Sequence, residues 1–194
     1  MLIFWESRLV FLATPKAGST AVEAALEALA NVAVQRPAAL KHANLATYQR
    51  HIAPWLHSAT GDHFTTVALM REPIDWLRSW YRFRQRDDDE DPDHAMTGIS
   101  FAEFAAHYAR PDGMAAARVG TQAEFLTDDG ARVDCIFRYE DMENFTHFLE
   151  DRLDCVLSLP RVNVPPAVDV SLNPDQERTL RDIMERDLRL YASL

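Results

Sequence analysis

Leu9–Thr20 has the sequence LVFLATPKAGST and carries the most specific pattern in the chain. The apolar run Leu9–Ala13 predicts a short buried strand, and Ala21–Ala30 predicts a helix whose apolar residues share one stripe. Between them, Thr14–Thr20 is a turn of small residues that contains one lysine, Lys16. Backbone N–H groups and the helix dipole both favour an anion at a helix N-terminus. The stretch therefore predicts a loop that binds a phosphate or a sulfate.

The side chains of this loop support the same interpretation. Lys16 supplies a full positive charge, while Ser19 and Thr20 supply hydroxyl donors that can also cap the helix. The loop differs from the G-x-x-x-x-G-K-[ST] pattern, in which lysine directly precedes the Ser or Thr that binds magnesium. Here Lys16 lies two residues before Gly18. A magnesium-dependent kinase or ATPase is thus disfavoured, although a P-loop nucleotide kinase stays an alternative.

A second junction of strand and helix follows later in the chain. Phe64–Met70 predicts a buried strand, and Pro73 suits the first turn of the helix after it. Arg71 directly follows the strand, and its guanidinium suits a phosphate monoester; Ser79 lies eight residues later, within the predicted helix. The alternative is that Arg71 pairs with Asp75 and that Ser79 faces solvent.

Strand and helix patterns alternate along the rest of the chain. Val133–Arg138 predicts a third buried strand, and Asn31–Leu40 predicts a loop or broken helix ended by Pro37. Helices are expected at Leu45–Leu56, Ser100–Tyr108 and Arg118–Leu126, from Asp141 or Glu143 through Leu149, and from Asn173 to Tyr191. The alternation predicts one α/β domain over residues 1–194, a three-layer sandwich with a central parallel sheet. Ligands bind at the carboxyl ends of such strands, so Lys16 and Arg71 should share one rim.

Composition excludes several classes of protein. An apolar content of 47% in 194 residues excludes a disordered chain. The net charge is −10, yet residues 1–86 carry ten basic against six acidic residues, so both anion-binding segments lie in the basic part. The acidic remainder argues against nucleic acid or an anionic membrane as partner. No run of membrane-spanning length and no signal peptide is found, which predicts a cytoplasmic protein.

The cysteines and histidines show no metal-binding pattern. Cys135 and Cys155 are far apart in the sequence and are expected to be reduced thiols in the core. The seven histidines form no H-x-x-x-H or H-E-x-x-H pair. We therefore expect no metal site.

The loop and the second junction together resemble a known family. Pro15-Lys16-Ala17-Gly18-Ser19-Thr20 is similar to the 5′-phosphosulfate loop of sulfotransferases that use 3′-phosphoadenosine 5′-phosphosulfate (PAPS), and Arg71 with Ser79 resembles their 3′-phosphate-binding segment. Gln122–Gly130, Arg138–Asp141 and Arg186–Tyr191 resemble later parts of the small bacterial and Golgi-type members. The resemblance implies the P-loop-like sulfotransferase fold, PAPS as co-substrate, and cofactor binding by Pro15, Lys16, Ala17, Gly18, Ser19, Thr20, Arg71 and Ser79.

Sulfuryl transfer needs cations near the leaving group and a base for the acceptor proton. Lys16 is expected to stabilise the leaving charge, and the N–H groups of Gly18, Ser19 and Thr20 to hold the 5′-phosphate. His42 is the first candidate base, because imidazole titrates near working pH and Leu40–Ala43 resembles a Lys-His-Ala segment of heparan-type and bacterial members.

Glu23 is the second candidate base, and a plain surface histidine is the alternative for His42. The acceptor is expected to be a hydroxyl or an amine on a small molecule or a glycan. The sequence leaves open which acceptor it is and the oligomeric state. A non-catalytic nucleotide-binding protein is the remaining alternative.

Overall fold

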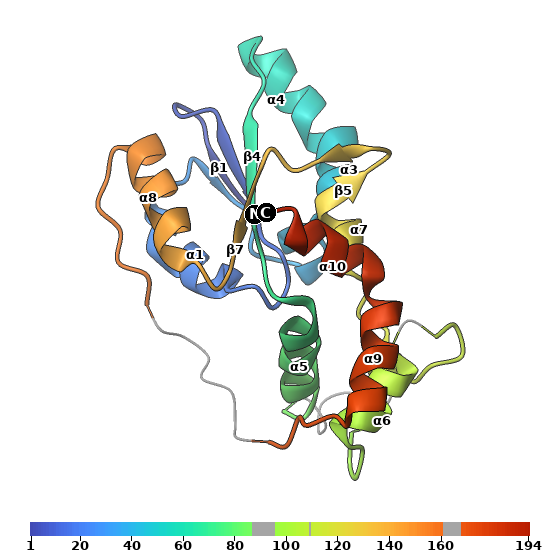
Figure 1. Cartoon of the computed structure of the whole chain (residues 1–194). Coiled ribbons are helices and arrows are strands. Elements are labelled where there is room, and N and C mark those ends of the chain that lie inside the picture. The colour runs from blue at the N-terminus through green and yellow to red at the C-terminus, as the bar shows by residue number, and fades with distance from the viewer. Residues whose placement is uncertain (87–95, 109, 161–167) are drawn as a thin grey trace. The chain divides into compact units, whose positions relative to one another are not determined.

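A computed structural model describes the chain except residues 87–95, 109 and 161–167 (Figure 1). The chain divides into two compact units. The first comprises Met1–Arg71, Gln122–Val162 and Leu194, and the second comprises Glu72–Thr121 and Asn163–Ser193. The expectation of one domain over residues 1–194 stays a prediction.

The first unit contains a five-stranded sheet in the order β3-β1-β2-β4-β7. Its strands are β1 (Leu2–Phe4), β2 (Leu9–Leu12), β3 (Val32–Ala33), β4 (Thr65–Met70) and β7 (Cys135–Arg138). The predicted strands β2, β4 and β7 are confirmed, and they are neighbours that run parallel. The expectation of an all-parallel sheet is wrong for β1, which pairs antiparallel with both β2 and β3. The sheet is therefore mostly, and not entirely, parallel.

Helices cover both faces of this sheet (Figure 1). On one face lie α1 (Ser19–Leu26) and α8 (Met142–Leu153). On the other lie α3 (Leu45–Thr47), α4 (Ala53–Thr60) and α7 (Gln122–Leu126). Alternate strand residues point to one face, so a single core gathers Leu9, Phe11, Val67 and Leu69 from the strands with Val22, Leu26, Phe145 and Leu149 from α1 and α8. This unit has the predicted α/β layers.

Several local predictions in this unit need correction. Pro37 does not end a helix but precedes one, α2 (Ala38–Lys41). The predicted helix over 45–56 is not one regular helix: a π-helical turn at Tyr48–Ile52 places Pro54 in the first turn of α4, where a missing N–H costs little. A small second sheet pairs β5 (Thr127–Asp128) with β6 (Ala131–Arg132).

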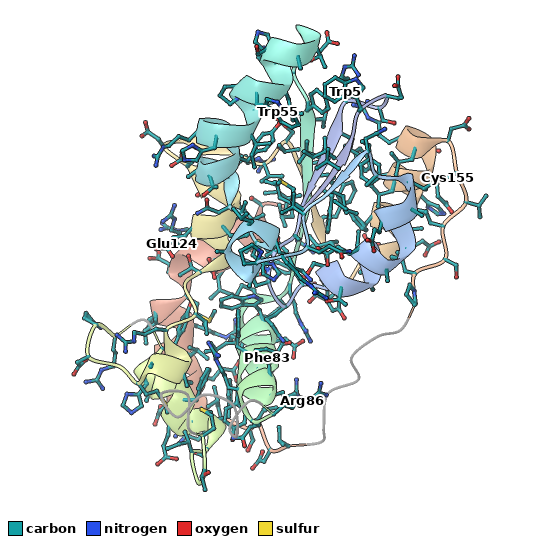
Figure 2. The ribbon with its side chains drawn as sticks, turned by 180° about the vertical axis from the view of Figure 1, so that it is seen from behind. Trp5, Trp55, Phe83, Arg86, Glu124 and Cys155 are labelled. Carbon is teal, nitrogen blue, oxygen red and sulfur yellow. The ribbon has the colours of Figure 1, made fainter. Side chains whose placement is uncertain are left out.

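The two cysteines are less buried than predicted. Both are free thiols, and both are half-buried. Cys135 lies in β7, at the edge of the five-stranded sheet, where every strand residue is half-buried. Cys155 follows the end of α8 (Figure 2).

The second unit is helical and contains α5 (Pro73–Arg84), α6 (Phe101–His107), α9 (Pro174–Ile183) and α10 (Glu185–Ala192). Its core packs aromatic residues of α5 and α6 against Leu180 of α9 and against Met184, which follows α9. The aromatic residues are Trp76, Tyr81, Phe101 and Phe104. The expected single helix from Asn173 to Tyr191 is wrong, because the chain breaks at Met184 between α9 and α10. The break exposes Ile183. The helix expected at 118–126 forms only over α7.

Candidate anion-binding site at the carboxyl ends of β2, β4 and β7

The loop between β2 and α1 has the backbone of an anion site. Lys16 and Gly18 both adopt the left-handed region, with φ of 60° and 78°. Gly18 is the N-cap of α1, and within the described residues no side chain caps this helix end. The first N–H groups of a helix have no carbonyl one turn earlier to bond. They can therefore receive an anion, with the positive end of the helix dipole behind them.

The loop side chains differ widely in exposure. Ser19 is buried and Thr20 is exposed. Both lie inside α1, so the expectation that they cap the helix is wrong. Pro15, Lys16 and Gly18 are half-buried, and Ala17 packs into the core of the first unit. Thr14, the first residue of the loop, is 1% exposed, and its Oγ1 has no hydrogen-bond partner among the described residues. An orphaned buried hydroxyl at this position is a donor that a ligand can use.

Gly18 lies against the ring of Tyr139. A Cβ added to Gly18 would be 2.8 Å from Tyr139 Cε2 and 3.7 Å from Met142 Cε. Tyr139 directly follows β7, and its N–H donates to the carbonyl of Met70 at 2.8 Å. Tyr139 is not among the predicted site residues, although it follows a predicted parallel strand just as Lys16 and Arg71 do. The same rule would have found it.

The guanidinium of Arg71 lies beside the loop. Its Nη1 donates to the carbonyl of Lys16 at 3.4 Å, and its Cζ is 4.9 Å from the centroid of the Tyr139 ring. The parallel pairing of β2 with β4, which sets Leu12 opposite Ala68, explains why the residues after both strands meet. The predicted shared rim is thus confirmed for the loop and Arg71. Ser79, half-buried on α5, belongs to the second unit, so its partnership with Arg71 stays a prediction.

Gln122 holds the backbone of Arg71. The Arg71 N–H donates to Gln122 Oε1 at 2.9 Å, and Gln122 Nε2 donates to the Arg71 carbonyl at 2.8 Å. Gln122 is 1% exposed and is the first residue of α7. Gln122 opens a segment that resembles the family, but the sequence does not predict its contact with Arg71, because the two residues are 51 positions apart.

His42 lies at the end of β2, next to the loop. Its Nδ1 is 2.6 Å from the carbonyl oxygen of Ala13. A carbonyl only accepts, so Nδ1 carries the proton and Nε2 keeps its lone pair. Burial lowers the pKa of His42 and so favours the neutral ring. The charge of Lys41 also lowers this pKa, whereas the Ala13 hydrogen bond and the charge of Glu23 raise it by less. A neutral imidazole with Nε2 unprotonated is the form that a general base needs.

Glu23 forms a buried ion pair. It is 3% exposed, and its Oε2 lies 2.7 Å from Lys41 Nζ. Its Oε1 lies 3.5 Å from the α-amino group of Met1, which also donates to the carbonyl of Lys41 at 3.0 Å. Both carboxylate oxygens therefore face cations. This arrangement favours a role in holding the segment before His42 over the predicted role as a base.

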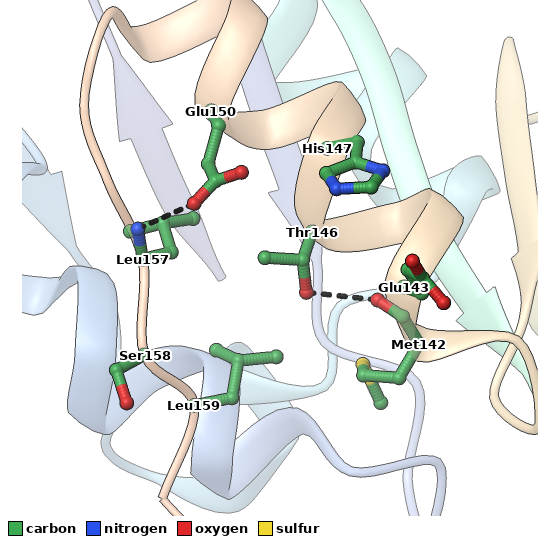
Figure 3. A pocket seen from close by; sticks show the side chains of 8 residues that line it. All are labelled: Met142, Glu143, Thr146, His147, Glu150, Leu157, Ser158 and Leu159. Atoms are coloured by element: carbon green, nitrogen blue, oxygen red, sulfur yellow. Dashed lines mark hydrogen bonds between the residues drawn. The ribbon is translucent and has the colours of Figure 1, made fainter.

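A groove of about 430 Å³ lies next to the loop (Figure 3). It is lined by α8 and by the segment after that helix, through Met142, Glu143, Thr146, His147, Glu150, Leu157, Ser158 and Leu159. Glu150 Oε1 accepts from the Leu157 N–H at 2.8 Å and so holds that segment. Met142 connects the groove to the loop, because it also lies beside Gly18. The groove offers thioether and leucine side chains next to hydroxyls and carboxylates.

Over residues 1–192 the chain matches the sulfotransferase family. It belongs to this family. Neither a curated protein nor a solved structure gives a significant match. The family match confirms the resemblance drawn from the two junctions. It supports sulfuryl transfer as the activity.

Two further findings concern the described part of this sulfotransferase. No helix in it is long and apolar enough to cross a membrane. No group of three or more His, Cys, Asp or Glu side chains is placed there to hold a metal ion. The candidate anion-binding site contains two basic residues, Lys16 and Arg71, beside the N-terminal end of α1.

Proposed function

We propose that this sulfotransferase transfers a sulfuryl group from PAPS to a hydroxyl or amine acceptor, without a bound metal. The observation that carries the proposal is the contact of Arg71 Nη1 with the Lys16 carbonyl, 3.4 Å away. It sets a guanidinium beside a loop that has its own cation and helix N-terminus. Two such elements suit a nucleotide that has anionic groups at both its 5′ and its 3′ positions.

The residues of the loop fit the 5′ end of this donor. When bound, PAPS supplies a sulfuryl group attached to a nucleotide leaving group. The N–H groups of Gly18, Ser19 and Thr20 bind the 5′-phosphate, and the orphaned hydroxyl of Thr14 adds a hydrogen bond. Lys16 offsets the negative charge that develops on the bridging oxygen as its bond to sulfur breaks.

His42 is the base in this proposal. Its Nδ1 is bound to Ala13, so Nε2 accepts the proton that the acceptor hydroxyl or amine loses as its bond to sulfur forms. The neutral imidazole, favoured by burial, can take this proton. The Ala13 carbonyl directly precedes Thr14, so the base and the loop are fixed to the same stretch of backbone.

The groove beside Met142 suits the base of the nucleotide. Met142, Leu157 and Leu159 offer apolar and polarisable contacts to a flat heteroaromatic ring. Glu143 and Glu150 would repel another anion but can accept from an exocyclic amino group. A neutral adenine therefore suits this lining better than a second phosphate group.

Calorimetric titration with 3′,5′-ADP and with magnesium ATP tests the donor. We expect 3′,5′-ADP to bind more tightly, whereas a P-loop kinase would prefer magnesium ATP. A transfer assay with ³⁵S-labelled PAPS and a panel of sugars, alcohols, phenols and amines then tests the activity. Tight binding of 3′,5′-ADP without transfer to any member of the panel would favour the non-catalytic alternative.

A further inference from the structure

Arg71 lies where the hydrogen bonding of the sheet ends. The last residue of β4, Met70, still gives its carbonyl to the Tyr139 N–H at 2.8 Å. One residue later, the N–H and the carbonyl of Arg71 both bond to the side chain of Gln122. Among side chains, only the amides of Gln and Asn combine an N–H donor with a carbonyl acceptor in the manner of a peptide group. Gln122 thus takes the place of a neighbouring strand for this one residue.

This contact fixes the origin of the Arg71 side chain. Gln122 is 1% exposed, so its two hydrogen bonds are shielded from water, and breaking them costs free energy. From this fixed backbone the guanidinium reaches the Lys16 carbonyl and the Tyr139 ring. A shift of the Arg71 backbone would move the guanidinium away from both. Bidentate recognition of a phosphate depends on such positioning.

We infer that Gln122 is a positioning residue that sets the selectivity of the site for a 3′-phosphorylated nucleotide, by holding Arg71 through its backbone. The inference rests on the proposed function, in which Arg71 binds the 3′-phosphate. It goes beyond that function because it assigns the selectivity to a residue that bonds to the backbone of Arg71. Gln122 would then have two effects: it attaches α7 to the end of β4, and it sets the preference for a 3′-phosphorylated nucleotide.

The test compares the dissociation constants of 3′,5′-ADP and 5′-AMP, measured by calorimetry on the full chain. These ligands differ only in the 3′-phosphate. Gln122→Met keeps the size of the side chain and removes both hydrogen bonds. Gln122→Glu keeps an acceptor for the Arg71 N–H and serves as the second variant should the first not fold. The matched control is Gln49→Ala, because Gln49 is an exposed glutamine of the same unit.

We expect Gln122→Met to weaken the binding of 3′,5′-ADP roughly tenfold or more and to change the affinity for 5′-AMP less than about twofold. Gln122→Glu should give an intermediate loss of preference, and Gln49→Ala should give none. In an Arg71→Ala background, Gln122→Met should cause no further change in the ratio of the two constants, because the residue acts through Arg71.

Equal weakening of both ligands, or an unchanged ratio in both Gln122 variants, would overturn the inference and leave Gln122 with a structural role only. In that case the proposed function would stand, provided that the wild type prefers 3′,5′-ADP. A wild type with no such preference would instead reject the PAPS donor, and with it the selectivity assigned to Gln122. The two failures are therefore distinguishable in one set of titrations.

Discussion

The imidazole of His42 is bound through Nδ1 to the backbone carbonyl of Ala13, at 2.6 Å. Ala13 is the residue between β2 and the loop that carries Lys16, so one short stretch of backbone positions both the proposed base and the proposed anion site. The contact fixes the tautomer and orients Nε2. The fold therefore sets both the tautomer and the pKa of His42.

His42→Ala should lower the turnover number by roughly 10²–10⁴, the range of general-base catalysis, and leave the affinity for 3′,5′-ADP unchanged. The wild-type rate should fall at acid pH as Nε2 becomes protonated. Because burial lowers the pKa of His42, the midpoint of this fall should lie below the value of about 6.5 found for a free imidazole. The rate of the His42→Ala variant should not show this fall at acid pH. His51→Ala, which changes an exposed histidine, is the control.

Glu23 and Lys41 should shift this acid limb in opposite directions. The charge of Glu23 raises the pKa of His42, and the charge of Lys41 lowers it. Glu23→Gln should therefore move the fall in rate to lower pH, and Lys41→Met should move it to higher pH. Rate profiles between about pH 4 and 8 measure both shifts. Were Glu23 itself the base, Glu23→Gln would abolish turnover at every pH, which would reject His42.

Lys16→Ala should lower the turnover number by roughly 10²–10³, the effect of removing one electrostatic stabiliser of a transition state. Binding of 3′,5′-ADP should weaken much less, because the N–H groups of α1 and Arg71 remain. Steady-state kinetics with calorimetry separates the two effects. Arg50→Ala removes a positive charge from an exposed position of the same unit and controls for the loss of charge. Near-normal turnover in Lys16→Ala would remove Lys16 from the mechanism.

Gly18→Ala and Gly61→Ala form a matched pair. Both glycines adopt a left-handed conformation, with φ of 78° and 75°, so each alanine should cost about 1 kcal/mol of backbone strain. Only at Gly18 would the new Cβ meet another residue, Tyr139 Cε2 at 2.8 Å, while Gly61 has nothing within 4 Å. Chemical denaturation should therefore show a larger loss of unfolding free energy for Gly18→Ala than for Gly61→Ala. Only Gly18→Ala should weaken the binding of 3′,5′-ADP, by about tenfold or more. Equal effects of the two variants would disprove the close contact with Tyr139.

The parts of the fold that the sequence predicts are those encoded by local patterns. The strand, turn and helix over residues 9–26 follow from an apolar run, a small-residue turn and a helical stripe, and Ser100 caps α6 as its position before Phe101 indicates. The shared edge of Lys16 and Arg71 needs only the rule for parallel strands. These elements depend little on distant contacts.

The features that the sequence does not predict depend on contacts between distant residues. Leu2–Phe4 becomes a strand because it can pair with both β2 and β3. Gln122 reaches the site only because α7 lies against the end of β4, which no pattern within α7 specifies. Pro54 is tolerated because a π-helical turn precedes it, and this geometry leaves no mark in the composition of the segment.

The groove beside Met142 can be tested by filling it. Thr146 lines the groove, and its hydroxyl donates to the Met142 carbonyl within α8 at 2.8 Å (Figure 3). Thr146→Trp should occupy the space proposed for the adenine and weaken 3′,5′-ADP by about tenfold or more. It should leave unchanged the affinity for ribose 3,5-bisphosphate, which has both phosphates and no base. The control is Asp151→Trp, on an exposed position of the same helix. Equal weakening of both ligands would mean that the variant disturbs the loop through Met142, and unchanged binding of both would place the base outside the groove.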